Sequence, residues 1–114
     1  MQGGTEWMID ARGCVAPRLA DRRAVVALLD RIVAAMDLHV ISTAVHQFPA
    51  PGGITAIYLL SESHLAIHTF PESATATLNV YCCTPRTPPA WADVLGEALG
   101  ATTVDATEHR RGRA

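Results

Sequence analysis

Apolar residues recur every three or four positions over residues 22–36, which predicts a helix with one buried face. Asp21 precedes this segment, where its carboxylate can accept hydrogen bonds from the backbone N–H groups of the first helical turn. A second helix is predicted at about residues 90–99, because a proline-rich stretch leads into it and Gly100 closes it.

Alternating or continuous apolar stretches elsewhere predict strands. The segment 49–53, rich in proline and glycine, separates two of them and predicts a hairpin. The element order β-α-β-β-β-β-α-β predicts an α+β fold, a two-layer α/β sandwich with a mostly antiparallel sheet and two helices on one face. The predicted strands cover residues 6–11, 40–48, 54–60, 65–70, 75–83 and 102–108.

The strand predicted at 75–83 has two unlike faces, because successive side chains of a strand point to opposite sides. One face is apolar and suits packing beneath helices. The other face is polar but uncharged, which favours a cavity or a contact with a second sheet over a fully solvated surface. This polar face carries Thr75, Thr77, Asn79, Tyr81 and Cys83.

The composition is that of a small globular protein. With 114 residues, the chain is expected to form one domain, 1–114. Hydrophobic residues make up 49% of it, a high share for a short chain, which favours self-association. The formal net charge of −2 gives no basic footprint for nucleic acid, so the basic end at 109–113 is interpreted as solvated.

No apolar run approaches the ~20 residues of a membrane span, and the first residues lack the order of a signal peptide. Three cysteines, two of them adjacent, do not form a disulfide framework. We therefore expect a cytoplasmic protein without membrane partners.

All nine basic residues are arginine, so the chain contains no lysine. Pyridoxal phosphate and amine catalysis both need a lysine that forms a Schiff base. If this protein performs imine chemistry, the carbonyl must come from the protein.

The segment 60–72 carries the candidate chemistry. Taken alone, it is typical of a strand, a polar turn and a second strand, with two ordinary histidines. His64 and His68 could also begin a metal site, but no third ligand of fitting spacing is evident, so no metal is expected.

The same segment resembles the self-cleaving segment of the prokaryotic S-adenosylmethionine decarboxylase family. There, Glu-Ser-His is followed by His-Thr-Trp-Pro-Glu; here, Glu62-Ser63-His64 is followed by His68-Thr69-Phe70-Pro71-Glu72. The resemblance extends over nearly the whole chain. It includes Cys14, His46-Gln47-Phe48, Cys83 and the closing segment 108–113.

This resemblance implies that the chain cuts itself between Glu62 and Ser63 into 1–62 and 63–114, and that Ser63 becomes a pyruvoyl group. The pyruvoyl ketone would form a Schiff base with S-adenosylmethionine, which loses carbon dioxide to supply spermidine and polyamine synthesis. The resemblance also favours a homodimer of cleaved chain pairs. One alternative is the same mechanism acting on arginine or ornithine; a less favoured one is a non-catalytic binding domain.

Residue roles follow from the same resemblance. Ser63 matches the pyruvoyl precursor, and His68 matches the histidine that handles protons during cleavage, with Thr55 as an assisting hydroxyl. Cys83 matches the proton donor of the decarboxylation. Cys82, which has the opposite parity, is expected in the core.

The substrate contacts implied by the resemblance are Phe48 on adenine and Glu72 on the ribose hydroxyls, with Phe70 and Asp10 as further contacts. Phe48 is equally consistent with a core phenylalanine. The chain departs from the family pattern at Phe70, where tryptophan is usual, and at Asn79, where aspartate is common. These changes concern the pocket more than the cleavage residues.

Ser63 and His68 are an odd number of positions apart, so a regular strand would place them on opposite faces. They can meet only if residues 61–65 form a turn or a bulge.

Overall fold

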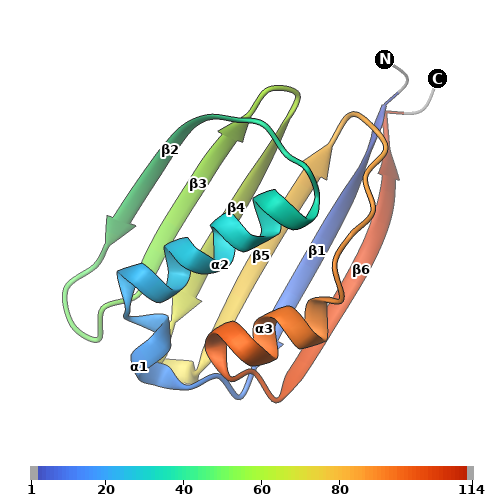
Figure 1. Cartoon of the computed structure of the whole chain (residues 1–114). Coiled ribbons are helices and arrows are strands. Elements are labelled where there is room, and N and C mark those ends of the chain that lie inside the picture. Colours follow the sequence, from blue (N-terminus) through green and yellow to red (C-terminus); the bar gives the residue numbers. More distant parts are fainter. Residues whose placement is uncertain (1–2, 113–114) are drawn as a thin grey trace.

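The computed structural model describes residues 3–112, in which six strands form one sheet in the order β2-β3-β4-β5-β1-β6 (Figure 1). Every neighbouring pair is antiparallel. The strands are β1 (Gly4–Arg12), β2 (Val40–Gln47), β3 (Ile54–Leu60), β4 (Ser63–Phe70), β5 (Thr75–Cys82) and β6 (Thr103–Arg111).

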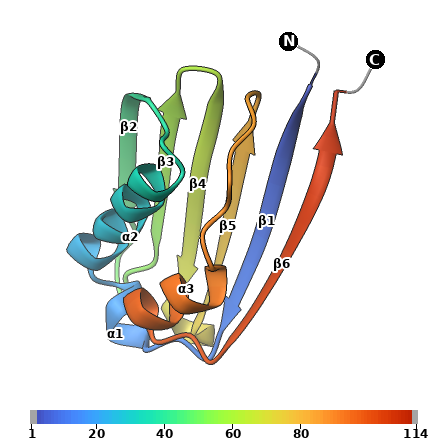
Figure 2. The same cartoon turned by 45° about the vertical axis from the view of Figure 1, so that its right-hand side comes forward.

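Two main helices, α2 (Arg22–Ala35) and α3 (Trp91–Leu99), lie side by side on one face of the sheet (Figures 1 and 2). Asp21 caps α2 as expected, since its carboxylate accepts from the backbone N–H groups of Arg23 at 3.0 Å and Ala24 at 3.3 Å. The predicted α+β class, with an antiparallel sheet and helices on one face, is confirmed.

Two short elements escaped prediction, the one-turn helix α1 (Ala16–Leu19) and the 3₁₀ helix η1 (Pro71–Ser73). Both are too short to show a helical period in the sequence. Across the described residues, no helix is both long and apolar enough to cross a membrane.

The hydrophobic core lies between the helices and the covered face of the sheet. In β5 the apolar residues Ala76, Leu78, Val80 and Cys82 are all buried, as their alternation predicted. Leu65 and Ile67 of β4 face the same side and are completely buried. The core is therefore built mainly from aliphatic side chains on one face of each strand.

The opposite face of the sheet, here called the open face, is not covered by any helix of residues 3–112 (Figure 2). Large apolar side chains stand on it: Met8 is 50% exposed, Ile57 47% and Leu59 52%. Large apolar side chains on an uncovered sheet face are a feature of surfaces that pack against a partner.

The basic end of the chain is exposed through Gly112, as predicted, but it belongs to a strand rather than to a free tail. β6 runs to Arg111 because it pairs with β1 along its whole length, ending with Arg111 opposite Gly4. His109 and Arg110 are exposed but belong to the strand, and Arg111 pairs with the Glu6 carboxylate at 2.5 Å. Arg113 lies outside the described residues.

Candidate active site

The candidate cleavage bond joins the turn residue Glu62 to Ser63, the first residue of β4. Ser61 and Glu62 are both exposed and lie outside the strand ladder. Ser63 is already within the ladder, opposite Leu60 of β3 and Cys82 of β5. The bond therefore lies at the surface, where an exposed turn meets a strand of the sheet.

Ser63 and His68 are not brought together within one chain. The turn is confined to residues 61–62, so β4 is regular from Ser63 onward, and the two side chains point to opposite faces. They are also five positions apart along the strand, which is roughly 17 Å at 3.3 Å per residue. Ser63 lies on the helix side beside Cys82, whose thiol pKa is raised by burial.

His68 lies opposite Thr55 of β3, and the Thr55 hydroxyl is 3.0 Å from Nδ1 of the imidazole. This hydrogen bond orients the ring on the open face. Around it lies a cavity of about 330 Å³, whose lining combines five of the predicted residues from β3, β4 and two connecting segments. The five are Phe48, Thr55, His68, Phe70 and Glu72.

Asp10, the remaining predicted substrate contact, lines a second cavity of about 390 Å³ on the open face. His68 lines both cavities, which are therefore neighbours. Asp10 stands directly opposite Asp105 of β6, and Asp105 forms an ion pair with Arg12 at 2.6 Å.

The two adjacent cysteines occupy different environments. Cys82 is buried in the core, as its parity predicted, whereas Cys83 is half-buried just beyond the end of β5. Cys83 directly follows Cys82, which pairs with Ser63, and its thiol raises the pKa of the nearby Tyr81 hydroxyl. Cys83 therefore lies near the cleavage end of the sheet, far from His68 of the same chain.

A chain of polar side chains crosses the open face near the cleavage bond. His64 Nε2 is 2.7 Å from Asn79 Oδ1, Asn79 Nδ2 donates to Glu6 at 2.5 Å, and Arg111 binds the other oxygen of Glu6. The His64 ring also stacks on Tyr81, with centroids 5.9 Å apart. Sequence analysis missed this cluster, because alternation placed Asn79 and Tyr81 on one face without indicating which strands flank them.

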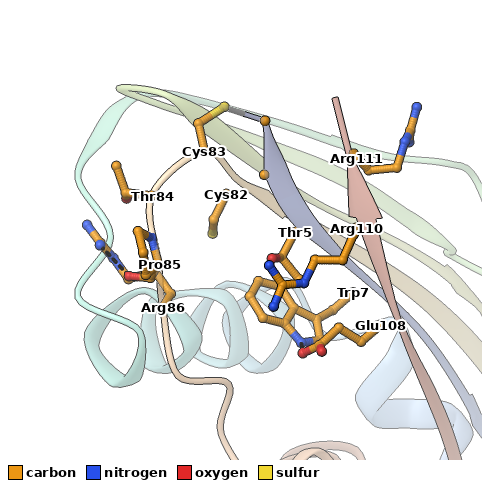
Figure 3. A pocket seen from close by; sticks show the side chains of 12 residues that line it. Thr5, Trp7, Cys82, Cys83, Thr84, Pro85, Arg86, Glu108, Arg110 and Arg111 are labelled. Atoms are coloured by element: carbon orange, nitrogen blue, oxygen red, sulfur yellow. Dashed lines mark hydrogen bonds between the residues drawn. The ribbon is translucent and has the colours of Figure 1, made fainter. Parts of the chain in front are cut away.

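A further cavity, of about 470 Å³, opens on the helix side at the same end of the sheet (Figure 3). Trp7 lines it and donates its indole N–H to Glu108 at 2.8 Å. Cys82 and Arg110 point toward it in Figure 3, whereas Arg111 points away. Nothing in the spacing of these residues along the sequence indicated that they share a cavity.

No group of three or more His, Cys, Asp or Glu side chains within residues 3–112 is arranged to hold a metal ion.

Comparison with known proteins agrees with this fold. The family model described as S-adenosylmethionine decarboxylase matches residues 5–112. The match spans nearly all of the residues that the structure describes and places the chain in a family of decarboxylases. The chain belongs to the S-adenosylmethionine decarboxylase family.

Individual relatives support the same assignment. The chain is 46% identical over 69 residues to the S-adenosylmethionine decarboxylase proenzyme of Anoxybacillus flavithermus, covering 60% of this chain but only 55% of that protein. It is 32% identical over 111 residues to the proenzyme of Clostridium tetani, covering 96% and 86% of the two chains. The crystal structure of adenosylmethionine decarboxylase from Aquifex aeolicus superposes with a TM-score of 0.82 at 31% identity, covering 99% and 93% of the chains.

Proposed function

We propose that this protein is a proenzyme that cuts itself between Glu62 and Ser63 and then decarboxylates S-adenosylmethionine for polyamine synthesis. One observation carries the proposal. Five of the residues expected to bind the nucleoside or to handle protons are scattered from position 48 to 72, yet they line one cavity of about 330 Å³. That volume is within the usual range for small-molecule sites.

The surroundings of Ser63 fit its conversion to a pyruvoyl group. Ser63 follows an exposed turn, so the preceding carbonyl is accessible to the Ser63 hydroxyl, and β4 holds the other side of the bond. A pyruvoyl group at this position supplies an electron-withdrawing ketone, the chemistry needed to decarboxylate an α-amino acid. The chain has no lysine for the alternative aldehyde cofactor.

Each lining residue has a task consistent with its contacts. The Thr55 hydroxyl is hydrogen-bonded to Nδ1 of His68, which leaves Nε2 of that ring to exchange a proton. Phe48 is 52% exposed and Phe70 39%, so both rings offer faces to a purine. Glu72 lines the same cavity, where its carboxylate can accept from the ribose hydroxyls.

We further propose that the working enzyme is a homodimer whose sites are shared between chains. Ser63 and Cys83 lie at one end of the sheet, whereas Thr55 and His68 lie roughly 17 Å along the strands at the other end. In this dimer, two copies stack with their open faces together and are related by a two-fold axis perpendicular to the strands. The axis reverses the strand direction of the second copy, so opposite ends of the two sheets lie against each other. Each Ser63 end then faces the His68 end of the second copy, and the exposed apolar side chains become buried. The Ser63 side chain lies on the helix side before the cut; once the bond to Glu62 is broken, the terminal group of residue 63 is free to turn toward the open face.

Mass spectrometry of the purified protein tests the cleavage. Wild-type protein is expected to give two chains, 1–62 and 63–114, the second lacking a free amine at its N-terminus. Ser63→Ala is expected to remain one chain. An intact wild-type chain after long incubation under native conditions would refute the proposal.

Release of carbon dioxide from carboxyl-labelled substrates tests the specificity. S-adenosylmethionine is expected to turn over, with arginine and ornithine near background, because the cavity offers two aromatic rings and a carboxylate. Turnover of arginine or ornithine in preference would reassign the substrate while leaving the self-cleavage intact.

A further inference from the structure

Self-cleavage leaves the reacting group at a new chain end, which creates a positioning problem. Before the cut, the turn at 61–62 ties the start of β4 to β3; afterwards this covalent tie is gone. Chain ends fray unless they are held. Catalysis is sensitive to such movement, since a misplacement of about 1 Å can cost about 10²-fold in rate. His64 is the first residue after the cut whose side chain lies on the open face.

The His64 side chain is held by three neighbouring strands. His64 Nε2 lies 2.7 Å from Asn79 Oδ1 on β5, and Asn79 Nδ2 donates to Glu6 Oε2 on β1 at 2.5 Å. Arg111 Nη1 on β6 donates to Glu6 Oε1 at 2.5 Å. The four residues thus cross β4, β5, β1 and β6, which are adjacent in that order in the sheet.

Hydrogen-bond donors and acceptors alternate along His64, Asn79, Glu6 and Arg111, which together are here called the tether. The Asn79 oxygen accepts from the imidazole N–H, its amide nitrogen donates to Glu6, and the Arg111 guanidinium donates to the second carboxylate oxygen. The hydrogen bond from Asn79 and the charge of Arg111 hold the pKa of Glu6 below its usual value, so the carboxylate is ionised at neutral pH. Hydrogen bonds to an ionised group are about twice as strong as neutral ones.

Ring stacking restrains His64 from a second direction. Its ring stacks on Tyr81 with an interplanar angle of 24°. Tyr81 in turn lies against Gly4, where an added Cβ would stand 3.1 Å from the tyrosine Cζ atom. The tyrosine ring therefore lies in the space that a side chain at position 4 would fill, packed between His64 and the backbone of β1.

We propose that Asn79 and Glu6 act as positioning residues, which hold the new end of β4 through His64 and so keep residue 63 in place after the cut. This inference rests on the proposed function, because it concerns the cleaved form. It assigns no proton transfer or substrate contact to these residues. It predicts that their contribution is small in the uncut chain, where the turn holds the strand, and large in the cut chain.

The test compares Asn79→Ala in two backgrounds by amide hydrogen exchange of the peptide that begins β4. In the cut protein, exchange of residues 64–66 is expected to rise about tenfold, the loss of roughly one good hydrogen bond. In the uncut Ser63→Ala background, Asn79→Ala is expected to leave exchange unchanged. The cut Asn79→Ala enzyme is also expected to lose about tenfold in kcat.

Two further variants keep the result interpretable. His64→Phe preserves a ring that can stack on Tyr81 but removes the donor to Asn79, and it is expected to reproduce the effect of Asn79→Ala in the cut form. Tyr58→Phe is the matched control, because it also removes one hydrogen bond, from Tyr58 to Asp30 at 2.8 Å, on the helix side. It is expected to change neither the exchange of residues 64–66 nor kcat.

The outcomes separate the inference from the proposed function. If wild-type protein does not cleave, the proposed function fails, and this inference fails with it. If wild-type protein cleaves and turns over, but cut Asn79→Ala matches it in exchange and kcat, only the inference is overturned. An equal rise of exchange in the cut and uncut backgrounds also overturns it, since the tether would then be an ordinary stabilising contact.

Discussion

Mixing two inactive variants tests whether the active site is shared between chains. Ser63→Ala cannot form the pyruvoyl group, and His68→Ala lacks the imidazole bonded to Thr55. Because the two positions lie roughly 17 Å apart on one strand, each site of a dimer is expected to combine Ser63 of one chain with His68 of the other. Each variant alone is therefore expected to be inactive, but a mixed dimer contains one fully intact site.

The expected magnitude follows from counting. When the two variants are co-expressed equally, about half of the dimers are mixed, and each mixed dimer has one intact site of two. Decarboxylase activity is thus expected to return to about a quarter of the wild-type value. The assay is carbon dioxide release, with mass spectrometry of the fraction of chains that are cut.

The control is a second pair of co-expressed variants, Ser63→Ala and Cys83→Ala. Both substitutions lie at the same end of the sheet, so they affect the same half of the shared site. Their mixed dimers contain no intact end, so the Cys83→Ala chains are expected to be cut while turnover stays at background. Background activity from the first pair would show that Ser63 and His68 act within one chain, which would refute the shared site. Full cleavage of His68→Ala alone would remove His68 from the processing step.

The remaining predictions concern single residues. Cys83→Ala is expected to cleave normally but lose about 10²–10⁴-fold in turnover as a general acid is removed, whereas Cys82→Ala should lose little; the reverse result would move the proton donor to Cys82. Ile67→Ala, at a completely buried position, is expected to lower the free energy of unfolding by about 2–5 kcal/mol in urea titrations, and a smaller loss would show that the core can collapse around the cavity. Burial and the hydrogen bond to Asp30 raise the pKa of Tyr58 from 10.0 to about 12, so its contribution to stability is present below pH 10 and lost toward pH 12. Alkaline unfolding curves of wild type and Tyr58→Phe should converge over that window, and parallel curves would contradict this assignment.

Much of the fold follows from periodicity in the sequence. The helical spacing in α2 and the alternation in β5 each specify which side chains are buried, because the two periods differ and only one face can meet the core. The absence of lysine and the Glu62-Ser63-His64 motif indicated the kind of chemistry without reference to any neighbouring strand. These features depend only on residues close together in the chain.

Only the tertiary structure decided which faces and ends meet. β1 lies between β5 and β6, which brings Glu6 beside Asn79 and Arg111, although periodicity is the same for any strand order. The register of β3 against β4 places Thr55 at His68 and leaves Ser63 at the far end, and a shift of one residue would have reversed the faces. Strand order and register depend on contacts between residues far apart in the sequence, which local patterns do not encode.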